Sequence, residues 1–568
     1  MSRKVVIVGG VAGGASAAAR VRRLDESAEI VMFERGDDVS YSNCSLPYYL
    51  GGLVETSEAL VLMTPEKFKG EHNIDVRVNS EVTAIHRETK TVAVKNTKTG
   101  ETYEESYDKL VLSPGASPIM PKSIKGIDRE NVFSVRNVTD IVGVKSYIDK
   151  TGAKDIIVVG GGFIGIEVAE NLKHVGKNVT VVEGLGQILA PFDLDLVQIL
   201  QKELYDNGVG LCLSSTLTAI EDGQVVCTKD GKEFTLPADA VVMSIGVAPE
   251  TKLAAEAGLE IGSTRGIKVN EHMQTADPDI YAVGDAVEIT NALTGKPGRL
   301  ALAGPAQWEA RAAADHMCGR SASYKGFIGS SCIRVFGLNA ASTGLNEKTA
   351  SAAGIDFDYV NVYPYDKVKI MPNAEPMAFK LVYSVPDGKI LGAQAIGKGD
   401  ATKRVDIIAA LIKMGGTICD LIEVEHCYAP LFSTAKDVVH MAALTAENIL
   451  EGRLKQVHVK DVRGIAESGA YIIDVREAWE YELSHIKGAH NIPLTELRDR
   501  LDEIPKDIPV YLHCRTSQRS YYAYCALKAR GFDNVVNLSG SFLGICLHEY
   551  FNDKTTGREP IVTDYNFK

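Results

Sequence analysis

Short runs of consecutive apolar residues, each followed at once by glycine, mark the first half of the chain. One run occupies residues 5–8 and precedes Gly9, and another occupies residues 156–159, after Asp155, and precedes Gly160. A stretch with helical spacing follows each turn, and then a further apolar run, at residues 30–33 and 179–182. Short apolar runs between turn signals are typical of buried parallel strands. The pattern therefore predicts two βαβ units, each with a glycine turn before its helix.

The glycine turns have the spacing of dinucleotide-binding loops. The first loop contains Gly9, Gly10, Ala12, Gly13 and Gly14, and the second contains Gly160, Gly162 and Gly165 in a full GxGxxG pattern. Glycine permits the tight turn and lets the helix approach the strand closely. The unpaired N–H groups at the start of the helix then favour a pyrophosphate. Two copies in the same context predict two bound dinucleotides.

An acidic residue ends the second strand of each unit. Glu34 follows residues 30–33, and Glu183 follows residues 179–182. A carboxylate in this place accepts hydrogen bonds from ribose hydroxyl groups. At Glu183 it would repel a 2′-phosphate, which favours NADH over NADPH.

Bulk composition excludes several classes of function. The chain has 568 residues, enough for three or four domains, with 45% hydrophobic and 24% charged residues and a net charge of −13. This acidic balance argues against nucleic acid as a partner. The basic residues Arg3 and Lys4, followed by the apolar and small residues 5–19, superficially resemble a signal peptide. A strand, a turn and a helix explain this stretch better. No apolar run is long enough to span a membrane, so no membrane contact is expected.

The cysteines indicate a reducing compartment. Ten cysteines without a regular spacing do not form a disulfide framework, and the absence of a CxxC pair makes a thiolate zinc cluster, or any other metal site, unexpected. We therefore expect a cytoplasmic enzyme.

Cys44 is the first candidate nucleophile. It lies shortly after Glu34 between polar residues, and no partner cysteine occurs at CxxxxC spacing. A single thiol cannot store two electrons as an internal disulfide. It must form a mixed disulfide or persulfide with its substrate, or become a sulfenic acid.

Cys514 is the second candidate. An apolar strand over residues 510–513 delivers it into a loop with Arg515 and Arg519, and a helix follows. Backbone N–H groups and the helix dipole at such a loop would lower the thiol pKa and cradle a persulfide. The second arginine lies five positions after the cysteine, which favours sulfur transfer over phosphatase chemistry. Both arginines would bind an anionic sulfur donor.

Several segments resemble the pyridine nucleotide-disulfide oxidoreductases. Residues 110–116 and 275–286 are similar to their second nucleotide-contact strand and late flavin motif, and residues 40–48 resemble the single-cysteine motif of the coenzyme A-disulfide reductase group. Residues 471–493 and the Cys514 loop resemble rhodanese. The whole chain resembles the coenzyme A-disulfide reductase–rhodanese fusions, also described as NADH-dependent persulfide reductases.

This resemblance implies FAD, NAD(P)H and coenzyme A as ligands and a homodimer as the assembly. Together, motifs and resemblance assign the following residues to FAD and the nicotinamide nucleotide: Gly9, Gly10, Ala12, Gly13, Gly14, Glu34, Asn43, Ser113, Gly115, Gly160, Gly162, Phe163, Gly165, Glu183, Gly246, Gly284, Asp285 and Ala303. Tyr428 would reach the redox cysteine of the other subunit and assist the leaving thiolate. Arg20, Arg22 and Arg23, on the first helix, would meet the phosphates of coenzyme A.

The resemblance also implies the architecture. We expect an α/β protein with an FAD-binding domain (1–120 and 246–321), an NAD(P)H-binding domain (121–245), an α+β dimerisation domain (322–452) and an α/β rhodanese domain (456–568). The tail over residues 549–568 has no assignment from the sequence.

The expected reaction is reduction of persulfide, polysulfide or coenzyme A persulfide by NAD(P)H through Cys44, coupled to sulfur transfer at Cys514. One departure from the family weakens coenzyme A disulfide itself as substrate: the second family tyrosine is missing, unless Tyr363 or Tyr365 replaces it. Ala12 stands where peroxidases of the group carry histidine, which argues against peroxide. Coenzyme A-disulfide reductase, NADH oxidase, a flavin electron-transfer protein and a non-enzymatic persulfide carrier remain as alternatives.

Overall fold

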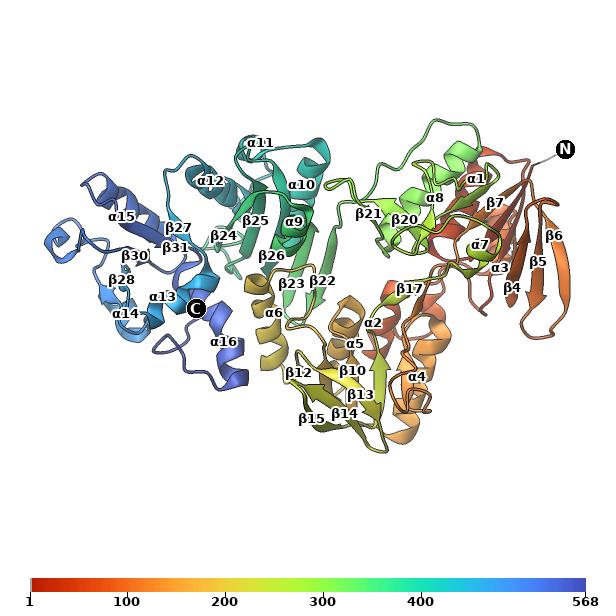
Figure 1. Cartoon of the computed structure of the whole chain (residues 1–568), viewed down its shortest axis with the longest axis horizontal. Helices are drawn as coiled ribbons and strands as arrows, with labels where there is room; N and C mark the ends of the chain where they lie inside the picture. Colours follow the sequence, from red (N-terminus) through yellow and green to blue (C-terminus); the bar gives the residue numbers. More distant parts are fainter. Residues whose placement is uncertain (1–2, 568) are drawn as a thin grey trace. The chain divides into compact units, whose positions relative to one another are not determined.

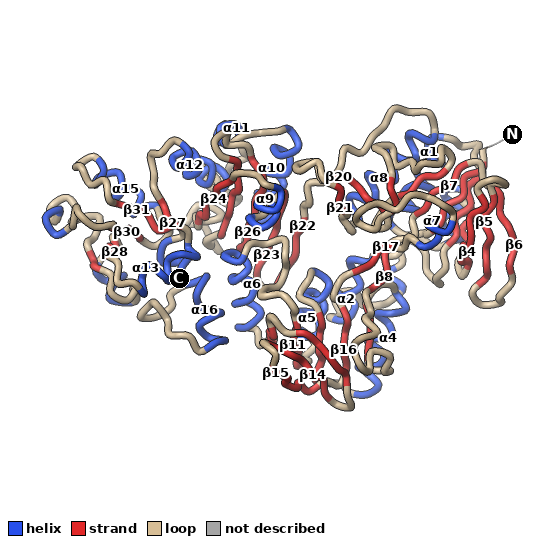
Figure 2. The backbone as a smooth tube through the Cα atoms, viewed as in Figure 1, coloured by secondary structure: helices blue, strands red, loops and turns tan. Residues whose placement is uncertain are grey.

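The computed structural model describes residues 3–567 and divides into two compact units. The first comprises Met1–Gly186 and Cys212–Phe327, and the second comprises Gln187–Leu211 and Ile328–Lys568. Figures 1 and 2 show the succession of elements in each. Among residues 3–567, no helix combines the length and apolarity needed to cross a bilayer.

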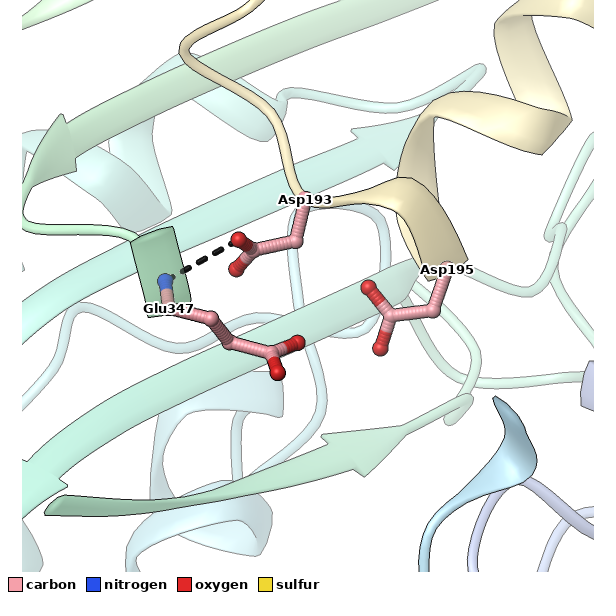
Figure 3. Close-up of side chains that lie close together, drawn as sticks. All are labelled: Asp193, Asp195 and Glu347. Atoms are coloured by element: carbon pink, nitrogen blue, oxygen red, sulfur yellow. Dashed lines mark hydrogen bonds between the residues drawn. The ribbon is translucent and has the colours of Figure 1, made fainter. Parts of the chain in front are cut away.

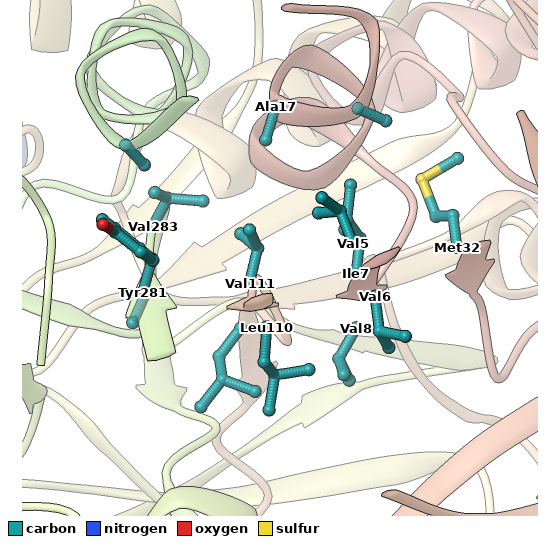
Figure 4. Close-up of a cluster of buried hydrophobic side chains, with 14 of the residues drawn as sticks. Val5, Val6, Ile7, Val8, Ala17, Met32, Leu110, Val111, Tyr281 and Val283 are labelled. Carbon is teal, nitrogen blue, oxygen red and sulfur yellow. The ribbon is translucent and has the colours of Figure 1, made fainter. Parts of the chain in front are cut away.

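The first unit begins with a five-stranded parallel sheet in the order β19-β7-β1-β2-β3. Its strands are β1 (Lys4–Val8), β2 (Glu29–Phe33), β3 (Asp75–Arg77), β7 (Lys109–Leu112) and β19 (Ile280–Ala282). Helices α1 (Ala12–Leu24) and α8 (Ala303–Met317) lie side by side over one face, toward which Val111 points while Leu110 points away (Figure 4). The predicted first βαβ unit is confirmed.

The second predicted βαβ unit is also confirmed. Parallel neighbours in its sheet are β9 (Val132–Ser134), β16 (Ala240–Met243), β10 (Asp155–Val159) and β11 (Asn178–Val182). Helix α5 (Phe163–His174) joins β10 to β11, and α4 (Val138–Thr151) precedes β10. The first compact unit also contains two three-stranded antiparallel sheets. One consists of β4 (Ser80–His86), β5 (Thr91–Asn96) and β6 (Thr102–Ser106), and the other of β13 (Thr216–Ile220), β14 (Gln224–Lys229) and β15 (Lys232–Pro237).

The second unit contains an antiparallel sheet in the order β22-β23-β26-β25-β24. The strands are β22 (Ser331–Val335), β23 (Leu338–Gly344), β24 (Phe357–Val362), β25 (Ala378–Ser384) and β26 (Ile390–Gly397). The helices around it are α9 (Glu347–Ala353), α10 (Ala401–Met414), α11 (Ile418–Glu423) and α12 (Val438–Leu450). The hairpin expected around Pro386–Gly388 joins β25 to β26.

A parallel sheet in the order β27-β31-β30-β28-β29 follows. Gly452 follows Glu451, the C-cap of α12, with φ +70°, a left-handed conformation suited to glycine. The strands are β27 (Gln456–Val457), β28 (Tyr471–Asp474), β29 (His490–Asn491), β30 (Val510–His513) and β31 (Val535–Leu538). The helices are α13 (Val462–Glu467), α14 (Ala478–Leu483), α15 (Gln518–Lys528) and α16 (Ser541–Thr556).

The C-terminal tail is part of this last domain. Helix α16 continues to Thr556, and the segment after it pairs with the domain through a bridge between Ile486 and Val562. Tyr565 and Phe567 then pack against its hydrophobic core. The tail therefore covers the domain.

One segment departs from the expected domain order. Residues 187–211, which carry α6 (Leu194–Asp206), lie within the sequence expected for the nucleotide-binding domain but pack in the second unit. Helix α6 packs against α16, where the ring of Tyr205 meets the ring of Tyr550 edge-on, with centroids 6.4 Å apart. The second unit thus includes a helix that lies far upstream in the sequence.

A buried ion cluster fixes this upstream segment. The side chains of Asp193, Asp195 and Glu347 converge (Figure 3), and the Lys380 ammonium lies among them at 3.1, 2.9 and 2.5 Å. Three converging carboxylates could ligate a metal ion, but here the ammonium already supplies the positive charge. Burial would raise the pKa of Asp195, but the Lys380 charge and the hydrogen bonds from Asn361 and Lys380 together lower that pKa. Lys460 of the last domain adds a bond of 2.8 Å to Glu347.

Replacing Lys380 tests this cluster. Lys380→Met would leave the buried carboxylates of Asp193 and Asp195, and the partly buried one of Glu347, without their central cation. We expect this change to lower the free energy of unfolding by about 3–5 kcal/mol. Lys398→Met is the matched control, because the Lys398 ammonium is largely exposed in its pair with Glu375. That change should cost less than about 1 kcal/mol. Urea denaturation of both variants measures the difference, and equal losses would contradict the role of the cluster.

Candidate active sites

The two glycine turns have the same geometry. A Cβ atom on Gly14 would overlap the carbonyl oxygen of Gly9, and a Cβ atom on Gly165 would overlap that of Gly160. Gly9 and Gly160 also have positive φ angles, of 93° and 109°. Each helix therefore starts as close to its strand as the backbone allows, and its N-terminal N–H groups face the turn.

The acidic residue at the end of each second strand also has the same partners in both units. Glu34 accepts from the backbone N–H groups of Gly10 (3.0 Å) and Gly36 (2.9 Å). Glu183 accepts from those of Gly161 (2.6 Å) and Leu185 (2.7 Å). Each carboxylate is thus fixed beside its glycine loop, where a nucleotide ribose would lie.

The remaining residues expected around FAD gather near the first turn. Ser113 follows β7 and lies so close to Gly13 that a Cβ there would approach its hydroxyl to 2.7 Å. Gly115 and Gly284 have positive φ, and a Cβ on Gly284 would lie 3.7 Å from the same hydroxyl. Burial raises the pKa of Asp285 against the opposing charges of Arg136 and Arg299. The close packing of these residues, together with a carboxylate that can accept hydrogen bonds from hydroxyl groups, fits a flavin dinucleotide.

Four other expected residues are placed as follows. Ala303 is the first residue of α8, Gly246 has φ +113°, and the Asn43 amide donates to the carbonyl oxygen of Arg136 at 3.3 Å. Phe163 is the first residue of α5, directly after the second glycine turn. Contact of these residues with cofactor stays a prediction.

Cys44 is an exposed thiol in a short 3-10 helix over Asn43–Ser45. Its surroundings raise the thiol pKa, first through partial burial and then through the charges of Glu167 and Asp285. The protein itself therefore favours the thiol over the thiolate at this position.

Glu167 and Glu309 are two site residues that the sequence did not single out. Glu167 lies on α5, and burial raises its pKa to about 7, although a hydrogen bond of 3.3 Å from the Tyr48 hydroxyl opposes the shift. Glu309 lies on α8, accepts from the Gly284 N–H at 2.7 Å, and also has its pKa raised to about 7 by burial. Both helices carry other polar residues as well, so the sequence offered no signal that singled these two acids out.

A pocket of about 370 Å³ lies beside the helix α1 arginines. Arg20, Arg23 and Arg311 line it together with Trp308, whose side chain is 62% exposed, and Ser40, which precedes Cys44 by four residues. Arg20 is held by Asp315 at 2.6 Å. The pocket thus combines several guanidinium groups with one accessible aromatic face.

Arg22 does not belong to this pocket, contrary to expectation. Its side chain is buried, and its guanidinium donates to the carbonyl oxygens of His72 (2.9 Å), Glu26 (2.7 Å) and Asn73 (2.9 Å). These bonds tie α1 to neighbouring loops. Arg22 is therefore a structural residue, because backbone carbonyl groups already occupy its guanidinium and it does not line the pocket.

The tyrosines of the second unit have different surroundings. Tyr428 is 50% exposed in an irregular segment, and Leu431 and Phe432 after it are also exposed. Tyr363 is buried against Gly540 and Gly544, where an added methyl group would meet its ring at 3.1 Å. Tyr363 therefore does not replace the missing family tyrosine. Tyr365 lies under the Lys369 ammonium, 5.2 Å from the ring centre.

The Cys514 loop has the geometry expected from the sequence. Cys514 follows β30, and Ser517 caps α15 with φ +74°. The Ser541 hydroxyl accepts from the Cys514 N–H at 3.1 Å and lies 4.0 Å from its sulfur. The sulfur is almost fully buried. Such a loop can hold a sulfur atom on Cys514 against backbone and hydroxyl donors.

Both arginines of the loop already have partners. Arg519 forms two bonds to the carboxylate of Glu480, at 2.5 and 2.8 Å. Arg515 donates to the carbonyl oxygen of Asn566, in the tail, at 2.8 Å. Binding of an anionic donor by Arg515 and Arg519 stays a prediction, and for Arg519 it would compete with the Glu480 carboxylate.

Replacing the packed glycine tests the flavin cradle. Gly14→Ala would force the first turn of α1 away from Gly9, and we expect flavin binding to weaken by about one to two orders of magnitude. Gly143→Ala, on helix α4, is the control, because a Cβ there meets no atom within 4 Å. Flavin absorbance per protein after gel filtration is the measurement. Full flavin content in Gly14→Ala would contradict the assignment.

The Cys44 thiol gives a second prediction. Because the ionised Glu167 disfavours a nearby thiolate, Glu167→Gln should lower the pKa of Cys44 and make its alkylation severalfold faster at about pH 8. Glu170→Gln on the same helix, whose carboxylate pairs with His174 at 3.4 Å, serves as the control. Iodoacetamide labelling against pH with peptide mapping reads out Cys44 alone. An unchanged or raised pKa in Glu167→Gln would contradict the electrostatic coupling.

Family comparisons cover most of the chain. Residues 3–310 match the pyridine nucleotide-disulphide oxidoreductase family, and residues 331–439 match the dimerisation domain of that family. Residues 458–548 match the rhodanese-like domain. These ranges correspond to the segments in which the Cys44 and Cys514 sites were found.

Individual proteins are also similar to this chain over most of its length. A coenzyme A disulfide reductase from Staphylococcus haemolyticus is 32% identical over 448 residues, which is 79% of this chain and all of the relative. The solved structure of reduced Bacillus anthracis CoADR-RHD is 42% identical, with a TM-score of 0.93 over 97% of this chain and 99% of the other. A NAD-dependent persulfide reductase from A. fulgidus is 35% identical, with a TM-score of 0.89 over 95% and 99%.

The domains, the two glycine cradles and the two cysteine sites lead to one assignment. The chain belongs to the pyridine nucleotide-disulphide oxidoreductase family, as an FAD- and NAD(P)H-dependent redox enzyme that carries a C-terminal rhodanese domain.

Proposed function

We propose that this enzyme reduces persulfide sulfur with NADH through Cys44 and handles sulfane sulfur at Cys514. The observation that carries the proposal is the pairing, in one chain, of an exposed single thiol with a buried thiol in a rhodanese loop. The similarity to a coenzyme A disulfide reductase and to a NAD-dependent persulfide reductase supports it.

The reaction follows from the chemistry of a single thiol. The Cys44 thiolate attacks the sulfur–sulfur bond of R–S–SH, so that RSH leaves and the outer sulfur stays on Cys44 as a persulfide. Two electrons and two protons then release H₂S and restore the Cys44 thiol. FAD, when bound, supplies the electron pair taken from the nicotinamide nucleotide. The sum is R–S–SH + NADH + H⁺ giving RSH + H₂S + NAD⁺.

Protons for this reaction come from groups around Cys44. Glu167 has its pKa raised to about 7 by burial, so it can both hold and release a proton at neutral pH. In a homodimer the partner subunit's Tyr428 would protonate the leaving thiolate. The exposed apolar side chains beside Tyr428 support such an assembly.

Coenzyme A is the proposed carrier of the substrate sulfur. The pocket beside α1 offers the guanidinium groups of Arg20, Arg23 and Arg311 to its phosphates, and the Trp308 ring to its adenine. Coenzyme A persulfide is then the first substrate, and coenzyme A disulfide, polysulfide and other persulfides are its competitors. Glu183 favours NADH, and ten free cysteines suit the cytoplasm.

A substrate panel tests the proposal. We expect NADH oxidation with the highest kcat/KM for coenzyme A persulfide, against coenzyme A disulfide, polysulfide, elemental sulfur and oxygen. Cys44→Ser should lose at least about a thousandfold of this rate, because no other thiol can attack in its place. Cys514→Ser, the matched control, should keep NADH oxidation with a preformed persulfide.

Other rankings would identify other functions. A preference for coenzyme A disulfide would indicate a disulfide reductase, and fast turnover with oxygen alone would indicate an oxidase. Full activity of Cys44→Ser with an external electron acceptor would indicate flavin electron transfer. Sulfur transfer without any NADH oxidation would indicate a persulfide carrier.

A further inference from the structure

Helix α16 holds the backbone of Cys514. Its first residue, Ser541, accepts a hydrogen bond from the Cys514 N–H through its side-chain oxygen at 3.1 Å. The Phe542 N–H donates to the Cys514 carbonyl oxygen at 3.0 Å, and the Leu543 N–H donates to that of Arg515 at 3.0 Å. The orientation of Cys514 is therefore fixed by a helix outside its own loop.

The Ser541 hydroxyl can still donate one hydrogen bond. Both of its acceptor positions are occupied, by the Cys514 N–H and by the Ser517 hydroxyl at 3.1 Å. Its proton has two acceptors within reach, the Leu538 carbonyl oxygen at 3.5 Å and the Cys514 sulfur at 4.0 Å. A neutral thiol is a weak acceptor, whereas an ionised group accepts much more strongly. The proton is therefore drawn to the sulfur once the sulfur carries a negative charge.

The backbone of Ser541 has a conformation that favours glycine. Its φ is +50°, and the residue is fully buried. A serine in the left-handed region costs free energy that a glycine would not, and such residues cluster at active sites. The presence of a serine in this position, beside a thiol, indicates that its hydroxyl has a function.

A tyrosine from the dimerisation domain flanks this turn. Tyr363 follows β24 and is 3% exposed. A Cβ atom on Gly540 or on Gly544 would lie 3.1 Å from its ring. The ring thus packs directly on the backbone before and after Ser541, and the start of α16 has no room to shift toward it. The Cys514 site is therefore assembled from two domains.

We propose that Ser541 is a catalytic residue of the Cys514 site, whose hydroxyl donates to the sulfur while the sulfur is anionic, and that Tyr363 is the residue that positions it. The inference rests on the proposed handling of sulfane sulfur at Cys514. It adds two residues to that site, one from each domain.

The sulfur on Cys514 is anionic before and after the loading step. With inorganic tetrasulfide as donor, Cys514–S⁻ + S₄²⁻ gives Cys514–S–S⁻ + S₃²⁻. The electron pair of the thiolate forms the new sulfur–sulfur bond, the pair of the broken bond leaves with trisulfide, and no proton is transferred. A hydroxyl fixed beside the sulfur stabilises this charge without reorganisation, as oxyanion-hole donors do.

Loading of Cys514 in the absence of NADH measures the role of Ser541. The full-length protein is mixed with sodium tetrasulfide, and the persulfide on Cys514 is trapped by alkylation and quantified by peptide mass spectrometry over time. We expect Ser541→Gly and Ser541→Ala to lower the maximal loading rate by at least about tenfold. The tetrasulfide concentration at half-maximal rate should not change, because the hydroxyl contacts the sulfur of Cys514 and not the donor.

Glycine at position 541 separates the hydroxyl from the turn. Because glycine suits φ +50° better than serine does, a residue that only shaped the turn would be replaceable by glycine. Full-rate loading in Ser541→Gly would therefore overturn the proposal, even if Ser541→Ala is slow. Ser214→Gly is the matched control and should load at the unaltered rate, since Ser214 has φ +53° and lies exposed in the first unit. NADH oxidation through Cys44 shows that each variant is folded, and Ser541→Ala decides alone if the glycine variant is not.

An added methyl group tests the position that Tyr363 gives to Ser541. Gly544→Ala would push the start of α16 away from the tyrosine ring, and we expect loading to slow severalfold. Gly464→Ala, in helix α13 of the same domain, is the control, because a Cβ there meets no atom within 4 Å. Tyr363→Phe keeps the ring and should load at the unaltered rate. Unchanged loading in Gly544→Ala would overturn the role of Tyr363.

Failure of this inference differs from failure of the proposed function. Full loading in the Ser541→Gly and Ser541→Ala variants would refute the inference and leave both proposed reactions standing. An unaltered protein that loads no sulfur on Cys514 would refute the proposed sulfur handling and the inference with it. A protein that loads Cys514 but oxidises no NADH with persulfide would refute only the proposed reductase function.

Discussion

The close approach of backbone to backbone at two glycine turns is the constraint on which the redox part of the enzyme depends. No Cβ fits between Gly14 and the Gly9 carbonyl group, or between Gly165 and that of Gly160. Each helix therefore starts close to its strand, with its N-terminal N–H groups at the glycine turn. The carboxylate of Glu34 lies beside the first turn and that of Glu183 beside the second. Two sites for anionic dinucleotides follow from the absence of a few methyl groups.

The second unit depends on a different principle, the pairing of buried charges. Lys380 among three carboxylates, Arg404 on Asp437 at 2.9 Å and Arg476 on Asp474 are all nearly or fully removed from water. Such pairs add little net stability compared with apolar packing, but each strongly disfavours arrangements in which a partner is missing. They specify which segments pack together, and the packing of α6 against the antiparallel sheet is one result.

Features carried by short stretches of sequence could be predicted, and features that depend on distant partners could not. The two βαβ units, the hairpin at Pro386–Gly388 and the Cys514 loop are local patterns, and the structure confirms them. From the sequence, residues 187–211 were expected to continue the nucleotide-binding domain. The residues that bind this segment in the second unit, Glu347 and Lys380, are far away in the sequence, so no local pattern indicated them.

The arginines show the same limit. Residues 20 and 23 share a face of α1 by helical spacing and line one pocket, whereas residue 22 does not. Helical spacing could have separated them, but we had expected all three at the same phosphates. For Arg519 no periodicity helps, because Glu480 is 39 residues away and belongs to another helix. The charge state of a catalytic loop is a property of the folded domain.

The packing of α6 against α16 also bears on how the fused domain can be handled. The relative from Staphylococcus haemolyticus aligns along its whole length with only 79% of this chain. Cutting this chain after residue 452 to obtain a similar length would remove Tyr550, Phe567 and Lys460. It would leave the Tyr205 ring without its aromatic neighbours and Glu347 without its second lysine. The rhodanese domain is therefore integral to the second unit, and separating it calls for redesign of the exposed surface.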